Sequence, residues 1–215
     1  MSNSTVNGII IFLIFATVGA GIIAYPSLPP EVASHWDVNG EVNGYMQKFW
    51  GVFLVPMIMA GLFIFYLIIP TIDPYRANIE TFRKQYSLIW LIVFGFLSYI
   101  FGLTLAWNVG YRFDFTIFII PAFALMWYFL GDFLKDSKRN WFVGIRTPWT
   151  LSSDVVWEKT HRLGATLFKL SALLSLFGLL IPNNGIRFFF GVIPVLVMSV
   201  VVVVYSYVVF RKEIR

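Results

Sequence analysis

The chain has no cysteine, little charge and only two histidines. Charged residues make up 13% of its 215 residues, about half of the roughly 25% found in soluble domains. Without cysteine, disulfides and thiolate metal sites are excluded. Hydrophobic residues make up 59%, with 23 Phe and 8 Trp. This balance predicts a polytopic membrane protein.

Six apolar runs are each close to the length of about 20 residues that crosses a bilayer. They cover residues 8–25, 50–70, 88–107, 115–130, 164–181 and 188–210. No Lys or Arg precedes Lys48, so the first run lacks the basic start of a signal peptide and is expected to remain as a helix. We therefore expect an all-α fold, a polytopic bundle of six transmembrane helices in the cell membrane.

Lys and Arg are divided unequally between the loops. If the N-terminus lies inside, twelve are on the inner side: Arg76, Arg83, Lys84, Lys135, Lys138, Arg139, Arg146, Lys159, Arg162, Arg211, Lys212 and Arg215. Three are on the outer side, Lys48, Arg112 and Arg187, and Lys169 falls within a run. The positive-inside rule then predicts cytoplasmic N- and C-termini. It also accounts for the net charge of +5, so we expect no direct nucleic-acid binding.

The second, fourth and sixth runs share a pattern. Each begins with an aromatic residue and reaches a proline six residues later, at Pro56, Pro121 or Pro194. This predicts a repeat of three helical hairpins. The corresponding domains are 1–70, with a structured outer loop at 26–49, then 71–131 and 132–215. The alternative is coincidence, because membrane helices tolerate proline.

The apolar runs are poor in ionisable groups. Asp114 and Asp132 lie at run ends, and the Lys169 side chain can extend to the interface. Ion-coupled carriers usually need acids or bases at mid-membrane. Coupled transport is therefore disfavoured, and a small transporter or export accessory protein that handles lipid or peptide passively stays as an alternative.

The outer loop contains two Asn-Gly pairs, at 39–40 and 43–44, which are tight-turn signals. A short strand at 34–38 would place His35 and Asp37 on one face. These two residues are the candidates for a metal site, but one histidine with carboxylates is a weak zinc set. The alternative is that His35 orders the loop through hydrogen bonds, and we expect no cofactor.

A polar segment, residues 140–162, separates the fourth and fifth runs, and we call it the signature segment. A helix is expected to begin near Asp154, which suits a helix N-terminus. The segment can form either a recognition surface or an anchor of tryptophans and basic residues at the membrane interface. Its candidate functional residues are Asn140, Gly144, Arg146, Thr147, Pro148, Trp149, Trp157, His161 and Arg162.

These residues resemble the signature of the SdpI family. The resemblance covers 144–151 (Gly-Ile-Arg-Thr-Pro-Trp-Thr-Leu), Trp157 and 160–162 (Thr-His-Arg), and Asn140 fits the same pattern. SdpI-like proteins are bacterial integral membrane proteins that give immunity to a secreted, membrane-active peptide toxin. In the best-known system the protein also holds a transcriptional repressor at the membrane. The resemblance therefore implies three partners: the lipid bilayer, a peptide toxin and a cytoplasmic repressor.

The outer loop resembles the N-terminal domain that often precedes this signature in longer relatives. The matching positions are Leu28, Pro29, His35, Asn39, Gly40, Gly44 and Lys48. The resemblance to that domain carries no mechanism. It makes His35, Asn39, Gly40, Gly44 and Lys48 the candidate functional residues outside.

The leading expectation is a non-enzymatic immunity and sensor protein, which meets toxin outside or within the bilayer and signals through its inner loop. The second is a membrane-embedded enzyme that uses His161 with Glu158, or His35 with Asp37, as acid–base groups. The sequence contains no HExxH, GxSxG or P-loop motif, which counts against an enzyme.

Overall fold

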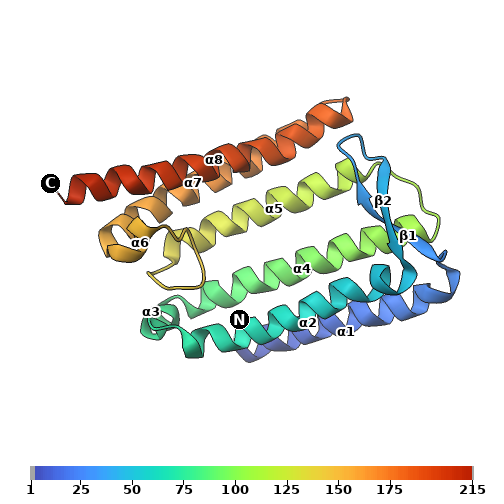
Figure 1. The fold of residues 1–215 in the computed structure, drawn as a ribbon, viewed down its shortest axis with the longest axis horizontal. Coiled ribbons are helices and arrows are strands. Elements are labelled where there is room, and N and C mark those ends of the chain that lie inside the picture. The colour runs from blue at the N-terminus through green and yellow to red at the C-terminus, as the bar shows by residue number, and fades with distance from the viewer. Residues whose placement is uncertain (1–2, 215) are drawn as a thin grey trace.

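The computed structural model describes residues 3–214, most of which lie in long helices arranged side by side (Figure 1). The helices are α1 (Asn3–Ala24), α2 (Lys48–Ile72), α3 (Arg76–Thr81), α4 (Arg83–Asn108), α5 (Phe115–Asp136), α6 (Pro148–Ser152), α7 (Asp154–Gly178) and α8 (Asn184–Glu213), and a 3-10 turn, η1 (Tyr25–Ser27), follows α1. One group contains α1, α2 and α4, and the other contains α5, α7 and α8. The two groups are joined where α4 packs against α5.

A β-hairpin at one end adds a small sheet to the expected helical bundle. Strand β1 (Glu31–Trp36) pairs antiparallel with β2 (Val42–Gln47). Figure 1 shows this hairpin at one end of the helices, with α3 and α6 at the other. We call these the hairpin end and the α6 end. The fold is thus mostly helical, with little sheet.

The hairpin differs in detail from the short strand expected at 34–38. The first strand begins three residues earlier, and Asp37 follows it in the turn instead of sharing a strand face with His35. The expected turn at 39–40 is confirmed, with Gly40 at φ 81°. The turn expected at 43–44 is wrong, because Gly44 pairs with His35 inside β2.

Within residues 3–214, five helical spans are long and apolar enough to cross a membrane: α1 with η1, α2, α4, α5 and α8. The exception among the long helices is α7, which begins in the charged signature segment. Only its residues 164–178 belong to the expected fifth run, and they extend about 22 Å at ~1.5 Å per residue, short of the ~30 Å of hydrocarbon. The count of six spans therefore stays a prediction, although α7 packs along both α5 and α8.

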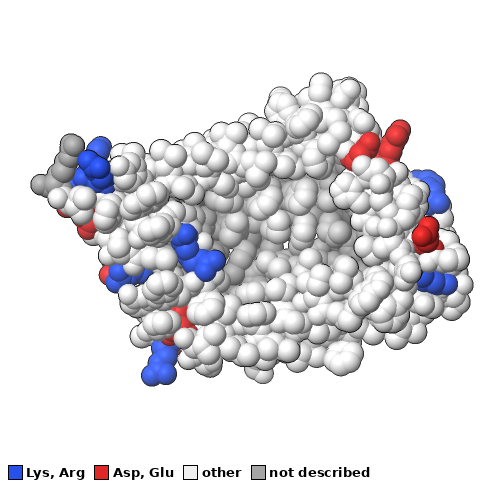
Figure 2. Space-filling model, in the orientation of Figure 1, with Lys and Arg blue, Asp and Glu red and all other residues white. Residues whose placement is uncertain are grey.

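Charge is confined to the two ends of the face drawn in Figure 2, with an uncharged band between them that is hollowed in the middle. Both ends of the described chain lie toward the α6 end. Ser87 at the start of α4 donates to Asn3 at 3.2 Å, and Ser153 donates to Glu213 at 2.7 Å. Arg215 lies outside the described residues. Assignment of the α6 end to the cytoplasm remains a prediction.

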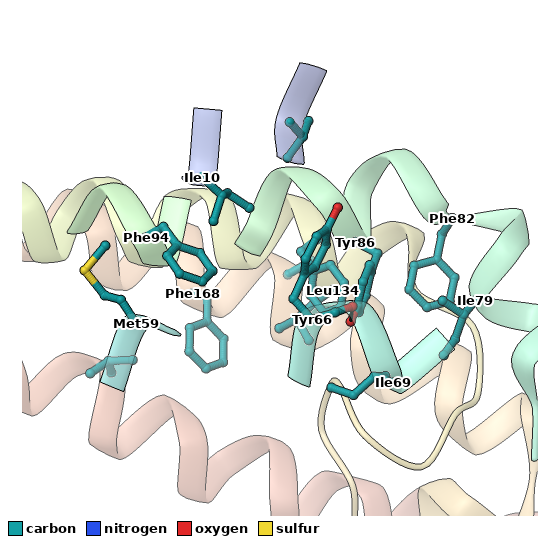
Figure 3. Packing of buried hydrophobic residues seen from close by; sticks show 14 residues of the cluster. Ile10, Met59, Tyr66, Ile69, Ile79, Phe82, Tyr86, Phe94, Leu134 and Phe168 are labelled. Atoms are coloured by element: carbon teal, nitrogen blue, oxygen red, sulfur yellow. Dashed lines mark hydrogen bonds between the residues drawn. The ribbon is translucent and has the colours of Figure 1, made fainter. Parts of the chain in front are cut away.

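Buried aromatic residues from several helices form the core toward the α6 end (Figure 3). The rings of Tyr66 and Tyr86 stack at 5.6 Å, and the Tyr86 hydroxyl donates to the Tyr66 carbonyl at 2.8 Å. Tyr66 in turn donates to Asn7 of α1 at 2.9 Å. Phe82 packs edge-on against Phe133 of α5. These contacts bring α1, α2, α4 and α5 together beside the signature segment.

Pro56, Pro121 and Pro194 lie inside α2, α5 and α8, and none of them ends its helix. The predicted three-hairpin repeat and its boundaries are neither confirmed nor contradicted by this placement. Between the second and third predicted hairpins, α5 and α7 approach closely. A Cβ on Gly131 would lie 2.7 Å from the Ala165 carbonyl oxygen, so only glycine permits this packing.

Candidate functional site

Asn140 organises the loop that follows α5, and its side chain is fully buried. Its carboxamide oxygen accepts from the backbone N–H groups of Phe142 and Val143, at 3.0 and 2.7 Å. Its NH₂ group donates to the carbonyls of Lys138 and Val143, both at 2.9 Å. All four bonding positions of the amide are therefore used within the loop, which makes Asn140 a structural residue.

His161 connects this loop to α7. Its Nε2 accepts from the N–H of Ile145 at 2.9 Å, and its Nδ1 contacts the Trp157 carbonyl at 2.8 Å. A carbonyl only accepts, so Nδ1 carries the proton and the ring is neutral. Burial lowers the pKa of His161 to about 4, and the hydrogen bond to the Trp157 carbonyl opposes this shift only in part. Both ring nitrogens are therefore engaged in hydrogen bonds, Nε2 as an acceptor and Nδ1 as a donor. The imidazole is poorly placed for acid–base chemistry.

Gly144 is required where the loop passes over this histidine. Its φ of 115° lies in a region that side-chain-bearing residues rarely adopt. A Cβ at this position would also lie 2.6 Å from Nε2 of His161 and 3.1 Å from the Trp157 ring. The glycine therefore permits both the backbone turn and the close approach that lets Ile145 reach the imidazole.

Trp157 is 1% exposed, so it presents a face neither to lipid nor to a partner. Its ring stacks on His161 at 4.0 Å, and its indole N–H donates to the Ser137 carbonyl at 3.0 Å. Ser137 is the residue that ends α5. Trp157 therefore ties the end of α5 to the first turns of α7.

Thr147 begins α6 and joins it to α8. It forms a reciprocal capping box with Thr150, and its hydroxyl lies 3.0 Å from that of Ser206 in α8. The Thr150 hydroxyl donates to the Ile145 carbonyl at 2.8 Å. Trp149 is half-buried, with its ring 5.0 Å from Tyr207 of α8. Threonine and tryptophan side chains thus hold the short α6 against the last helix.

Four of the predicted residues are exposed: Gly144, Arg146, Pro148 and Arg162. Arg146 donates to the Trp141 carbonyl at 2.6 Å, and Arg162 pairs with Glu158 at 2.8 Å on the surface of α7. The structure therefore divides the signature segment into a buried framework and a small exposed set.

Two residues that the sequence reasoning missed also hold this segment. Asp73, between α2 and α3, is 2% exposed and accepts from the N–H groups of Trp141 and Tyr75, at 2.9 and 2.6 Å. Asn78 of α3 donates to the Arg139 carbonyl at 2.8 Å. Asp73 is followed by proline, which is a local turn signal, but no spacing in the sequence points to a partner 68 residues away.

The outer candidates lie in or beside the hairpin. His35 is exposed and its Nδ1 lies 2.5 Å from the Asn43 side-chain oxygen, across the two strands. Asp37 accepts from the N–H groups of Asn39 and Glu41, both at 2.9 Å, and so shapes the turn around Gly40. In the described chain, no group of three His, Cys, Asp or Glu residues is placed to hold a metal ion.

The other outer candidates, Gly44 and Lys48, also stabilise the hairpin. A Cβ on Gly44 would lie 2.9 Å from the Cβ of His35, so glycine lets the strands approach. Lys48 lies over the Tyr25 ring at 4.7 Å, where its cation is attracted by the ring face.

A buried ion pair that the sequence did not suggest closes the hairpin end. Arg187 donates to Asp114 at 2.7 Å, to Asn184 at 2.9 Å and to Thr116 at 3.2 Å. Partial burial raises the pKa of Asp114, but the hydrogen bonds from Thr116 and Arg187 outweigh it and lower the pKa. Asn184 also donates to the Asn39 carbonyl at 2.9 Å, so the starts of α5 and α8 and the hairpin turn are held together.

Replacing Gly144 with alanine tests the framework, and Gly110→Ala is a matched control. Both glycines have a φ near 115°, but a Cβ on Gly110 would meet nothing within 4 Å. Gly144→Ala is expected to lose about 1–3 kcal/mol more stability than the control, because its Cβ collides with His161. Thermal unfolding of the purified proteins in detergent measures the difference, and equal losses would contradict it.

Acid is expected to destabilise the framework through His161. Its pKa in the folded protein is about 4 against an ordinary 6.5. The stabilising contribution of the neutral His161 to folding is therefore complete above pH 6.5, and it falls by about 3 kcal/mol as the pH drops toward 4. Melting temperatures between pH 7.5 and 4 compare the wild type with His161→Gln, which does not titrate. If both lose stability in parallel, the effect belongs to other groups.

Comparison with known proteins relates both ends of the chain to described families. The model of the SdpI/YfhL protein family matches residues 137–208, and that of a domain of unknown function (DUF1648) matches residues 12–60. The chain is 27% identical to the Immunity protein SdpI of Bacillus subtilis (strain 168), over 94% of this chain and 89% of that protein. No solved structure gives a significant match. The chain is therefore a multi-pass cell-membrane protein whose residues 137–208 match the model of the SdpI/YfhL protein family.

Proposed function

We propose that this protein is an immunity protein, which protects a bacterial cell against a secreted, membrane-active peptide toxin. The observation that carries the proposal is the likeness to Immunity protein SdpI, which extends over 94% of the chain. It includes the hairpin, the signature segment and the helices between them. A likeness of that extent is expected when the whole architecture serves one role, because a shared loop alone would align only locally.

The proposed topology has six spans with both termini in the cytoplasm, so the hairpin end faces outward and meets the toxin. A pocket of about 270 Å³ lies beneath the hairpin, where Trp36, Phe115 and Phe188 contribute to its walls. Trp36 stacks on Phe115 at 4.2 Å, and its buried indole N–H has no acceptor among the described residues. An apolar cavity of this kind suits an apolar side chain of a peptide.

The α6 end is the proposed read-out side, where a cytoplasmic repressor would bind. Most of the signature segment is engaged in its own fold, as the bonds of Asn140 and His161 show. The Arg146 guanidinium and the Trp141 ring, which is 48% exposed, remain available on the surface. Arginine and tryptophan are the residue types most often found at protein–protein hot spots.

A killing assay in a strain that makes the toxin tests immunity. Deletion of the gene should make the producer sensitive, and the wild-type chain should restore survival. Trp36→Ala should lose at least about tenfold in protection, because it removes the stacked wall of the outer pocket. Tyr111→Ala is the control, since Tyr111 is 72% exposed and lies outside that pocket. A deletion strain that survives as well as its parent would refute the proposed function.

Signalling is tested separately with Arg146→Ala. This variant should protect as well as the wild type but lose most toxin-dependent repressor recruitment, followed as membrane association of a fluorescently tagged repressor. Lys159→Ala is the control, because Lys159 is also exposed on this side but lies outside the 140–149 loop. Recruitment that survives Arg146→Ala unchanged would count against a partner at this surface.

A further inference from the structure

A cavity of about 700 Å³ lies beside the buried framework of the signature segment. The end of α5 and the residues after it form one wall, and α7 forms the other. Trp157 and His161 contribute to its floor, although both are almost completely buried. Neither the framework hydrogen bonds nor the proposed read-out surface accounts for this space.

The cavity is lined by more cations than acids. Five basic residues line it: Lys135, Lys138, Arg139, Arg162 and Lys169. Arg139 and Arg162 are paired with the lining acids Asp154 and Glu158, at 2.9 and 2.8 Å, and Lys169 is paired with Asp132. Lys135 and Lys138 are exposed and have no ion-pair partner among the described residues. The cavity therefore carries two unneutralised positive charges.

The cavity also extends along α7 from the charged segment into the apolar run. Its lining includes Asp154 at the first turn and Lys169 fifteen residues later, a distance of about 22 Å along a helix. The expected fifth run begins at residue 164, so in the proposed topology Ala165, Thr166 and Lys169 line the part of the cavity that reaches into the bilayer. In that topology, one end of the cavity lies at the membrane surface and the other lies within the bilayer.

We propose that this cavity binds an anionic phospholipid, with its phosphate headgroup against Lys135 and Lys138 and the start of an acyl chain along α7. Two free ammonium groups beside neighbouring guanidiniums match a phosphate. A soluble phosphate would use the same cations but has no need of the deeper part of the cavity along α7. An acidic peptide would have to place polar backbone in that deeper part, at a cost in unpaired hydrogen-bonding groups.

The test is a titration of the detergent-purified full chain with phosphatidylglycerol, followed by native mass spectrometry. One lipid should bind with a preference of at least about tenfold over phosphatidylcholine. Lys135→Gln/Lys138→Gln should weaken binding by at least about tenfold, since each basic residue near an anionic headgroup contributes about a factor of five to ten. Arg76→Gln/Lys212→Gln makes the same charge change on exposed residues outside the cavity and should bind like the wild type.

A second variant, Thr166→Phe, keeps the proposal testable if the lysine variant folds poorly, because it fills the deeper part of the cavity from an exposed position on α7. It should also lose binding. Equal affinity for phosphatidylcholine, or equal loss in both double variants, would overturn the proposal. So would glycerol phosphate or polyglutamate competing as strongly as the lipid. The titration contains no toxin, so its failure would leave the immunity proposal standing.

Discussion

The neutral, buried imidazole of His161 in α7 holds the signature segment in place. His161 accepts from the Ile145 amide and bonds to the Trp157 carbonyl, while the Trp157 indole reaches the end of α5 at Ser137. Three stretches of chain converge on this stacked pair. The arrangement requires Nε2 to be unprotonated, and burial enforces that state by disfavouring the charged ring. Gly144, Arg146 and the α6 cap at Thr147 lie next to Ile145, in the loop that this hydrogen bond holds against α7.

The hairpin end is held by different chemistry. There Arg187 and Asp114 form a buried ion pair whose remaining bonding positions are filled by Thr116, Asn184 and backbone carbonyls. A buried pair is tolerated when its hydrogen bonds are satisfied in this way. Because α5 and α8 contribute to both this pair and the signature framework, they are the continuous elements between the two ends. Between the two ends, apolar packing and a few hydrogen bonds join the helices, such as the bond that Ser175 of α7 donates to the Gly191 carbonyl of α8 at 3.2 Å.

Much of the fold was predictable because the bilayer restricts what a spanning segment can be. Hydropathy located the long helices, and the 39–40 turn followed from its Asn-Gly pair. The hairpin register was not predictable, because Gly44 serves a close approach to His35 instead of a turn. The sequence placed Trp157 among candidate anchor or recognition residues, since tryptophan suits both roles, and only packing showed it buried. Asp73 and Arg187 were missed because their partners lie 68 and 73 residues away.

The sequence by itself determined that this chain crosses a membrane and carries the SdpI-type signature, because composition, run length and a contiguous motif are local properties. The tertiary structure decided what the signature residues do. It buries Asn140, Trp157 and His161 as a framework, leaves Arg146 on the surface and opens a cationic cavity between α5 and α7. These outcomes depend on which distant segments meet, since burial, protonation and unpaired charge are set by neighbours in space.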